Sequence, residues 1–235
     1  MKNNKDSFTL LCFDEKMSVI DLDCFKRSFL SFPANYMLDF DCFWRWKLKI
    51  ETEDGHVLDE NHQGETYHKL SDILASWQAY RSSRNYAPWV TLKHSLEAIS
   101  DAYNKIRTYS LLECDKISSQ SLELIWHELG RVKEYDGNKN DMGSYYIISV
   151  CKPLMLLWGQ TLAFDSRVRA HVPYRYNFVE KTRWTFREWM VMIKRFQEVL
   201  RQDSMVVSFF KKEALKRYGS ESIVPYGRFL DIYYF

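Results

Sequence analysis

The chain has 235 residues, of which 46% are hydrophobic, 27% are charged and 16% are aromatic. These proportions exclude a disordered, collagen-like or coiled-coil protein, and the length allows one large domain or two small ones. The sequence holds only 8 Gly and 5 Pro, too few for the turns of a many-stranded barrel or sandwich, so helices are the expected elements.

The formal net charge of +2 hides an uneven distribution along the chain. Residues 1–65 carry a net charge of −5, whereas residues 166–235 carry +7 and interleave Arg and Lys with Trp and Tyr. Such a surface neutralises phosphates and stacks on unpaired bases, which favours a nucleic-acid partner. The alternative is that these basic residues form the solvated faces of amphipathic helices.

The five cysteines are odd in number and widely spaced, and no Cys-x-x-Cys occurs. The N-terminal residues lack the apolar stretch of a signal peptide, and Lys152 interrupts the longest apolar stretch, Tyr145 to Trp158. The sequence therefore predicts a reduced, cytoplasmic protein without a membrane span.

The first predicted helix starts near Ser18, at the spacing of a capping box. Next, apolar and charged residues alternate from Trp44 to Glu51, which is the period of a β-strand, and an Asp-Gly turn pair follows. The pattern predicts a small antiparallel β-hairpin near residues 40–60, packed onto the rest of the protein by Trp44 and Trp46.

Helices are predicted for most of the remaining chain, from apolar residues at helical spacing. Pro88 in a first turn and the capping box of Thr185 with Glu188 mark helix starts, and a glycine follows several of the helix ends. The predicted helices cover approximately residues 70–80, 88–106, 119–129, 145–158, 185–200, 204–218 and 228–235.

No internal repeat and no Pro/Gly/Ser-rich linker divides the sequence. The prediction is one domain over residues 1–235, either undivided or with an N-terminal α/β subdomain at 1–65 and a helical body at 66–235. The predicted fold class is mainly α (α+β), a helical body with the small hairpin near the N-terminus.

Most motifs of catalytic or cofactor chemistry do not occur. There is no Gly-x-Ser-x-Gly elbow, no Walker A loop and no Gly-x-Gly-x-x-Gly, so neither an activated serine nor a nucleotide cofactor is predicted. His56, His62 and His68 lie six residues apart, whereas metal ligands on one helix face need separations of three or four. These histidines are predicted to lie in an exposed loop, and the protein is predicted to hold no metal and no cofactor.

One segment, residues 149–169, places a charged residue within an apolar helix and an acid at the start of the next helix. Lys152 lies in the apolar helix, a glycine ends that helix, and Asp165 follows a short apolar loop. A carboxylate at the positive end of a helix dipole stays ionised, and Asp is a preferred N-cap residue. Two alternatives are therefore open. Lys152 and Asp165 are catalytic residues, or Asp165 only caps a helix and Lys152 only extends its side chain from an apolar helix to water.

Over about residues 145–171, this arrangement resembles the core of the helix-hairpin-helix DNA glycosylase superfamily, particularly the oxoguanine-type enzymes and the bacterial proteins with the same fold. In that family an apolar helix with the catalytic lysine leads through a loop to the catalytic aspartate, which a His-Val-x-Arg-like sequence follows. The corresponding stretch here is Ala163-Phe164-Asp165-Ser166-Arg167-Val168-Arg169.

The resemblance implies a helical glycosylase-like body that binds DNA, with Asp165 and Lys152 as catalytic residues and Ser149 as the alternative match to the family lysine. Trp158 is the nearest candidate for a wall that holds a base outside the stack. The basic residues predicted to bind nucleic acid beside this site are Arg167, Arg169, Lys181, Arg183 and Arg187.

The leading hypothesis is a DNA-binding protein of glycosylase-like fold, which either excises a modified base by cleaving its N-glycosidic bond or uses an inactive fold as a reader. RNA in place of DNA is left open. The alternative hypothesis is a non-enzymatic helical interaction protein, such as a component of a bacterial defence or toxin system. In that case the acidic N-terminal third and the basic C-terminal end contact other proteins.

Overall fold

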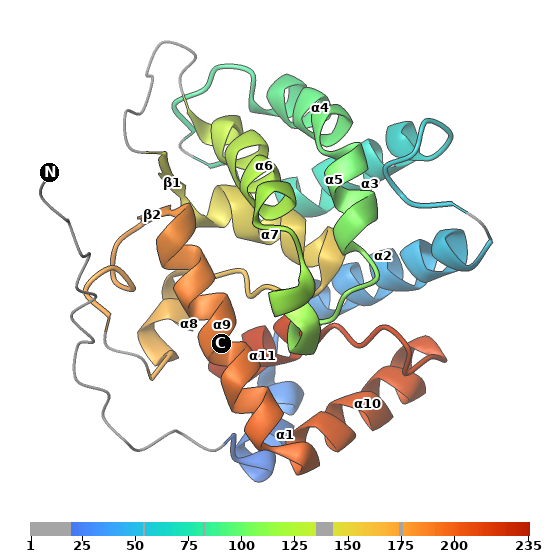
Figure 1. Cartoon of the computed structure of the whole chain (residues 1–235), viewed down its shortest axis with the longest axis vertical. Helices are drawn as coiled ribbons and strands as arrows, with labels where there is room; N and C mark the ends of the chain where they lie inside the picture. The colour runs from blue at the N-terminus through green and yellow to red at the C-terminus, as the bar shows by residue number, and fades with distance from the viewer. Residues whose placement is uncertain (1–19, 54, 82, 135–142, 174–175) are drawn as a thin grey trace, which may run out of the picture.

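The computed structural model describes residues 20–53, 55–81, 83–134, 143–173 and 176–235. Over these ranges the protein is mainly helical, with one small antiparallel sheet (Figure 1). No helix in this part of the chain is both long enough and apolar enough to span a membrane.

The helices follow one another along the chain, and two short 3₁₀ helices, η1 and η2, lie among them. In chain order the elements are α1 (Leu22–Ser31), α2 (Ala34–Thr52), α3 (Gln63–Ser76), α4 (Pro88–Ala98), α5 (Ser100–Ile106), η1 (Leu111–Lys116), α6 (Ser119–Gly130), η2 (Arg131–Lys133), β1 (Ser144–Tyr146), α7 (Ile147–Trp158), α8 (Ser166–His171), β2 (Arg183–Thr185), α9 (Phe186–Gln202), α10 (Ser204–Tyr218) and α11 (Tyr226–Tyr234).

Several helix ends lie where the sequence predicts them. Gly159 ends α7 and Gly219 ends α10, each with φ of 73°, a left-handed conformation that glycine adopts without strain. At the start of α9 the Glu188 carboxylate accepts from the Thr185 N–H at 2.7 Å, and the Thr185 hydroxyl accepts from the Glu188 N–H at 3.2 Å. The predicted capping box is therefore confirmed. Ser18, the predicted start of the first helix, lies outside the described residues.

The predicted hairpin near residues 40–60 is wrong, because this region belongs mostly to α2. The sheet instead pairs β1 with β2, with Tyr145 opposite Trp184. The alternating pattern misled because Lys47, a member of its charged half, is fully buried, with its Nζ 2.6 Å from a carboxylate oxygen of Glu51 one helical turn further on. A buried i, i+4 ion pair belongs to a helix and not to a half-exposed strand.

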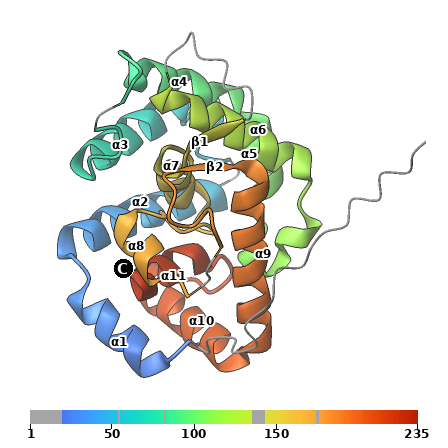
Figure 2. The same ribbon diagram turned by 90° about the vertical axis from the view of Figure 1, so that its left-hand side faces the viewer.

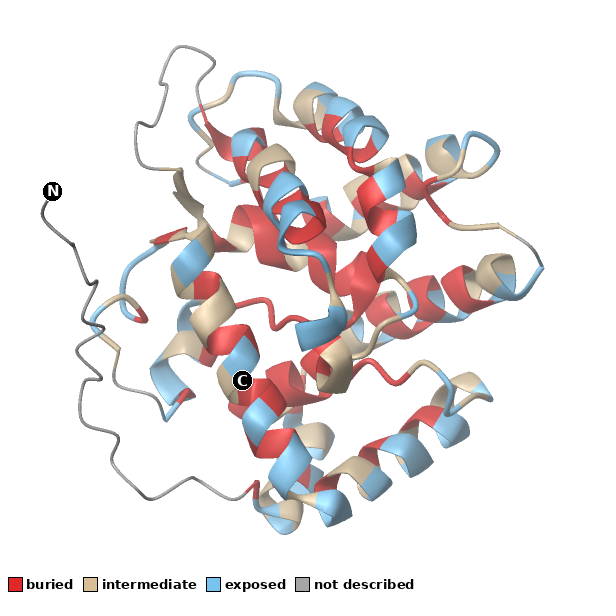
Figure 3. Ribbon diagram, viewed as in Figure 1, coloured by how far each residue is buried: buried red, intermediate tan, exposed pale blue. Residues whose placement is uncertain are grey.

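Helix α7 occupies the centre of the molecule. Figure 2 shows it nearly end-on with helices around it, and Figure 3 shows it as largely buried. All of its residues are buried except Ile148 and Lys152, which are partly exposed. One core cluster takes in side chains from Ile20 to Tyr234, and so joins residues 20–65 to the rest of the chain.

Candidate functional site

Lys152 and Asp165 line the same pocket. The pocket holds about 310 Å³ of space outside the protein atoms, its open mouth included, and its polar side chains include one lysine, one arginine and two aspartates. We call it the Lys152 pocket. Its lining residues are Phe32, Tyr36, Trp77, Lys152, Met155, Ala163, Asp165, Arg228, Asp231 and Phe235.

Lys152 reaches the pocket from the buried helix α7. Its Nζ donates a hydrogen bond to the backbone carbonyl oxygen of Trp77 at 3.0 Å. Burial lowers the pKa of Lys152, while the negative charges of Asp165 and Asp231 oppose that shift. A lowered pKa leaves more of the amine neutral, and the neutral amine is the nucleophilic form.

Ser149, the alternative match to the family lysine, does not line this pocket. Its side chain is fully buried, and its Oγ donates to the carbonyl oxygen of Leu129 in α6 at 2.8 Å. Of the two candidates on α7, Lys152 is therefore the one that shares a pocket with Asp165.

Asp165 is the N-cap of α8, as predicted. Its carboxylate accepts from the backbone N–H groups of Arg167 at 2.9 Å and Val168 at 3.1 Å. Asp165, Tyr36 and Phe235 also line a second, adjoining space, the outer groove, whose other lining residues are Pro33, Asn35, Ser166 and Arg167. Asp165 therefore lies between the two spaces, and its cap hydrogen bonds fix the direction of its carboxylate.

The pocket also contains a buried ion pair that was not predicted, between Arg228 and Asp231 of α11. The Arg228 guanidinium donates to Asp231 Oδ2 at 3.0 Å, and each residue is 2% exposed. Burial raises the pKa of Asp231 to about 6, with Arg228 opposing the shift and Asp165 adding to it. The available signal was two opposite charges three residues apart within the otherwise apolar and aromatic helix Tyr226–Tyr234.

Two residues next to the pocket have a strained backbone. Gln78 and Phe164 each have φ of 50°, and they are the non-glycine residues with positive φ in the described ranges. Gln78 follows Trp77, whose carbonyl oxygen holds Lys152, and Phe164 precedes Asp165. Such conformations persist where the surrounding structure fixes them, and they concentrate at functional sites.

The loop between α7 and Asp165 is packed directly on the start of α11. The backbone N–H of Gly227 donates to the carbonyl oxygen of Gly159 at 2.9 Å. A Cβ on Gly227 would overlap the backbone of Gln160 and Thr161, so only glycine allows this approach. The contact fixes the loop relative to the helix that carries Arg228 and Asp231.

Among the basic residues predicted to bind nucleic acid, Arg167 lies beside the pocket. Its side chain is exposed, lines the outer groove and places its guanidinium 4.9 Å from the ring centre of Phe235. Lys181 and Arg187 are also exposed, but they lie before and after β2 and line neither space.

Two of the predicted basic residues instead hold the fold together. Arg169 donates to the carbonyl oxygens of Glu180 and Lys181. Arg183 pairs with the buried Glu134 at 2.9 Å and donates to the carbonyl oxygen of Ser144 at 2.7 Å. The guanidinium groups of these two residues thus bind partners within the protein, and nucleic-acid binding by the five residues stays a prediction.

The role predicted for Trp158 is also wrong. Its side chain is fully buried, and its Nε1 donates to the carbonyl oxygen of Tyr109 at 3.0 Å, so it cannot stack on a base. Aromatic walls come instead from segments far away in the sequence. The aromatic residues that line the Lys152 pocket are Phe32, Tyr36, Trp77 and Phe235.

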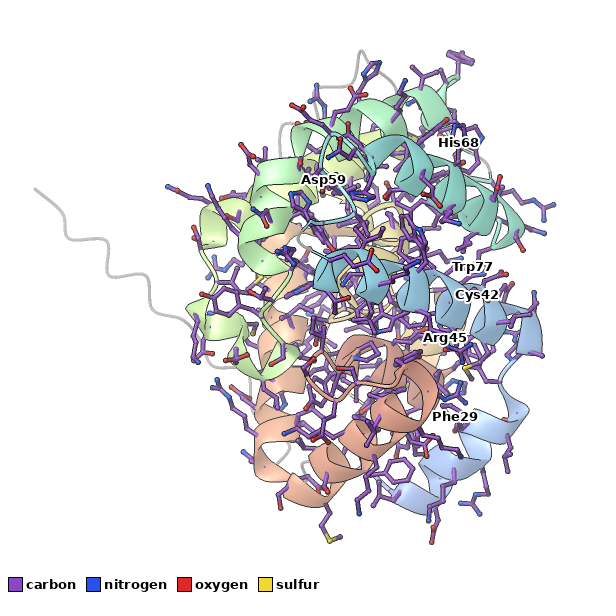
Figure 4. All side chains as sticks on the ribbon, turned by 90° about the vertical axis from the view of Figure 1, so that its right-hand side faces the viewer. Phe29, Cys42, Arg45, Asp59, His68 and Trp77 are labelled. Atoms are coloured by element: carbon purple, nitrogen blue, oxygen red, sulfur yellow. The ribbon has the colours of Figure 1, made fainter. Side chains whose placement is uncertain are left out.

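The prediction that the three histidines lie in an exposed loop is wrong, because His56 and His62 are partly buried and His68 lies in α3. A carboxylate holds the turn before that helix. Asp59 accepts from the backbone N–H of His62 at 2.9 Å, and its Oδ1 lies 2.7 Å from the His62 ring Nδ1. Figure 4 shows Asp59 in the turn before α3 and His68 on α3 itself. Within the ranges that the structure describes, no three His, Cys, Asp or Glu side chains are grouped so as to hold a metal ion.

Comparison of the chain with protein-family models, curated proteins and solved structures found no match. The pocket itself therefore carries the functional argument. Its residues define a small space lined by four aromatic side chains together with the amine of Lys152, the guanidinium of Arg228 and the carboxylates of Asp165 and Asp231.

Proposed function

We propose that the Lys152 pocket is an active site that cleaves N-glycosidic bonds in DNA, with Lys152 as the nucleophile and Asp165 as the stabilising carboxylate. The main support is that these two residues, one on α7 and one at the start of α8, line one pocket. They are also the two residues that correspond to the catalytic pair in the resemblance to the glycosylase superfamily.

The proposed reaction begins when a nucleotide leaves the base stack and its C1′ approaches Lys152. The neutral amine of Lys152 attacks C1′ as the glycosidic bond breaks, and the base leaves with the bonding electrons and takes up a proton. Positive charge that develops on the sugar is stabilised by the carboxylate of Asp165. One proton of the attacking amine thus ends on the departed base. The other moves to O4′ as the C1′–O4′ bond breaks, which opens the sugar ring and leaves an imine between Lys152 and C1′ that borohydride reduces.

The surroundings of the pocket support a polynucleotide substrate. Arg167 in the outer groove carries an exposed guanidinium, which suits a phosphate next to the extruded nucleotide. Tyr36 and Phe235 line both spaces and present aromatic surface for a base or a sugar.

The test uses duplexes that carry a panel of modified bases or an abasic site, with and without borohydride. The parent protein should form a covalent adduct, and Lys152→Gln should not. Asp165→Asn keeps a side chain that caps helices and should lower base excision on the order of 100- to 1000-fold, as loss of a transition-state electrostatic partner does. Lys93→Gln changes an exposed lysine of α4 outside the pocket, so it is the matched control and should react as the parent does.

The proposal is contradicted if the parent protein excises no base from any of these duplexes and forms no adduct with any of them. A DNA affinity that persists in that case would favour a reader. No affinity at low salt would favour the non-enzymatic interaction protein.

A further inference from the structure

We propose that Asp231 is the positioning residue of the Lys152 pocket: its carboxylate fixes the turn that carries Asp165 and supplies buried negative charge near Lys152. This inference rests on the proposed function, because it assigns a role to a residue that does not itself react.

The first support is the hydrogen bond between Asp231 and the turn before α8. Asp231 Oδ1 accepts from the backbone N–H of Ala163 at 2.8 Å, inside the protein. Ala163 precedes Phe164, the residue with positive φ, and Phe164 precedes Asp165. Because this hydrogen bond holds the chain next to the strained residue, Asp231 limits the directions in which the Asp165 carboxylate can point.

The second support is the way Arg228 holds Asp231. One Arg228 nitrogen donates to Asp231 Oδ2 at 3.0 Å and another donates to the carbonyl oxygen of Tyr36 at 2.8 Å. The guanidinium also lies 4.7 Å from the ring centre of Phe32 and 5.0 Å from that of Phe40. Arg228 thus ties the carboxylate to an aromatic wall of the pocket.

A role in stability alone explains this ion pair poorly. Removing two charges from water is costly, and apolar residues of similar volume often stabilise a core as well as a buried pair does. The pair does, however, connect three parts of the pocket: α11, the turn at Ala163 and the wall at Tyr36. A role in positioning these parts of the pocket relative to one another accounts for all three connections.

The charged groups around Asp231 come from three elements. Arg228 lies on the same helix, Asp165 follows the turn, and Lys152 lies on α7. Burial raises the pKa of the Cys151 thiol, also on α7, and the negative charge of Asp231 adds to that shift. Of these groups, Lys152 provides a reporter, since its amine can be modified without nucleic acid.

The experiment compares Asp231→Asn with the parent by reductive methylation. Formaldehyde and cyanoborohydride methylate neutral amines, and mass spectrometry of the Lys152 peptide gives the extent at each pH. Removing a nearby negative charge lowers the pKa of Lys152, so the variant should be methylated at lower pH than the parent. At a pH at which Lys152 is neutral in both proteins, adduct formation with abasic DNA should slow on the order of 10- to 100-fold, the cost of a misplaced catalytic group.

Glu134→Gln is the matched control. It neutralises a carboxylate that is 8% exposed and paired with Arg183, but that does not line the pocket. Loss of a buried ion pair should lower the stability of both variants, whereas only Asp231→Asn should shift the pH profile of Lys152 methylation. A folded Asp231→Asn with the methylation profile of the parent overturns the inference.

Two further outcomes are decisive. If Asp231→Asn does not fold, the parent is titrated by NMR, where the amide of Ala163 should shift with a midpoint near the Asp231 pKa of about 6. An amide that does not titrate overturns the inference. If the parent traps no DNA while Asp231→Asn still shifts the Lys152 profile, the proposed function fails and only the electrostatic link between Asp231 and Lys152 stands; the positioning role is then overturned together with the function.

Discussion

Two regions of the molecule place a lysine among core residues together with a carboxylate: the Lys152 pocket, and a cluster of Lys47, Glu51 and Tyr103 between α2 and α5. In the cluster, Lys47 Nζ lies 2.6 Å from Glu51 Oε2, and neither side chain is more than 1% exposed. The ammonium lies 4.4 Å from the ring centre of Trp44, and the Tyr103 hydroxyl donates to Glu51 Oε1 at 2.6 Å. The charges of this cluster are paired with one another.

The Lys152 pocket differs in the partner of its lysine and in its access. Lys152 bonds to a backbone carbonyl oxygen and not to a carboxylate, it is partly exposed, and it lines open space beside Asp165. Burial lowers the pKa of Lys152 and of Lys47 alike. A lowered lysine pKa therefore does not distinguish the two regions, whereas the open space and the carboxylate not bound by the lysine do.

The largest expected effect is on the closed cluster. Lys47→Met leaves the Glu51 carboxylate buried without its partner, so it should lower the free energy of unfolding by about 3–5 kcal/mol. Urea denaturation measures the loss. Lys152→Met is the companion variant: it removes one hydrogen bond at a partly exposed position and should cost about 1 kcal/mol. Equal losses for the two variants would contradict the distinction between the regions.

The next effect concerns the contact that fixes the loop before Asp165. Gly227→Ala places a methyl group in the backbone of Gln160 and Thr161, and should cost about 1–3 kcal/mol of unfolding free energy. Gly64 is the matched control, because a Cβ there meets nothing within 4 Å and the residue lies in α3. Gly64→Ala should stabilise the protein by roughly 0.5–1 kcal/mol, so thermal melting should move the two variants in opposite directions.

A further effect is expected in the pH dependence of stability. In the native protein Asp231 has a pKa of about 6, whereas its ordinary value is 3.8. Between these values the native state binds the additional proton, so the contribution of Asp231 to the free energy of unfolding falls as the pH rises through this window. Asp231→Asn should remove that fall. Urea denaturation at several pH values tests this, and identical pH slopes for parent and variant would show that Asp231 does not titrate as described.

Local signals in the sequence predicted much of the helical structure. The Thr185 capping box and the glycines after α7 and α10 depend on backbone chemistry within a few residues, and the structure has them in place. The strand prediction around Lys47 was wrong because it assumed that every charged residue of the alternating pattern is exposed. Lys47 is buried, since its ion pair with Glu51 compensates its charge. Trp158 failed for a related reason, since an aromatic residue close to a site in sequence can still face the core.

The pocket was only partly predictable. Lys152 and Asp165 stood out because a charge within an apolar helix and an acid at a helix start are visible in sequence. The walls at Phe32, Trp77 and Phe235 were not, because they meet only through tertiary packing of distant segments. Asp231 is a further case: its hydrogen bond to Ala163 joins residues separated by 68 positions.

The most direct test of the central claim is to identify the residue that carries the adduct. After borohydride treatment of the parent protein with abasic or modified-base DNA, protease digestion and mass spectrometry locate the modified lysine. The account predicts that the reduced sugar is attached to Lys152. Attachment to a different lysine, with Lys152 unmodified, would contradict it.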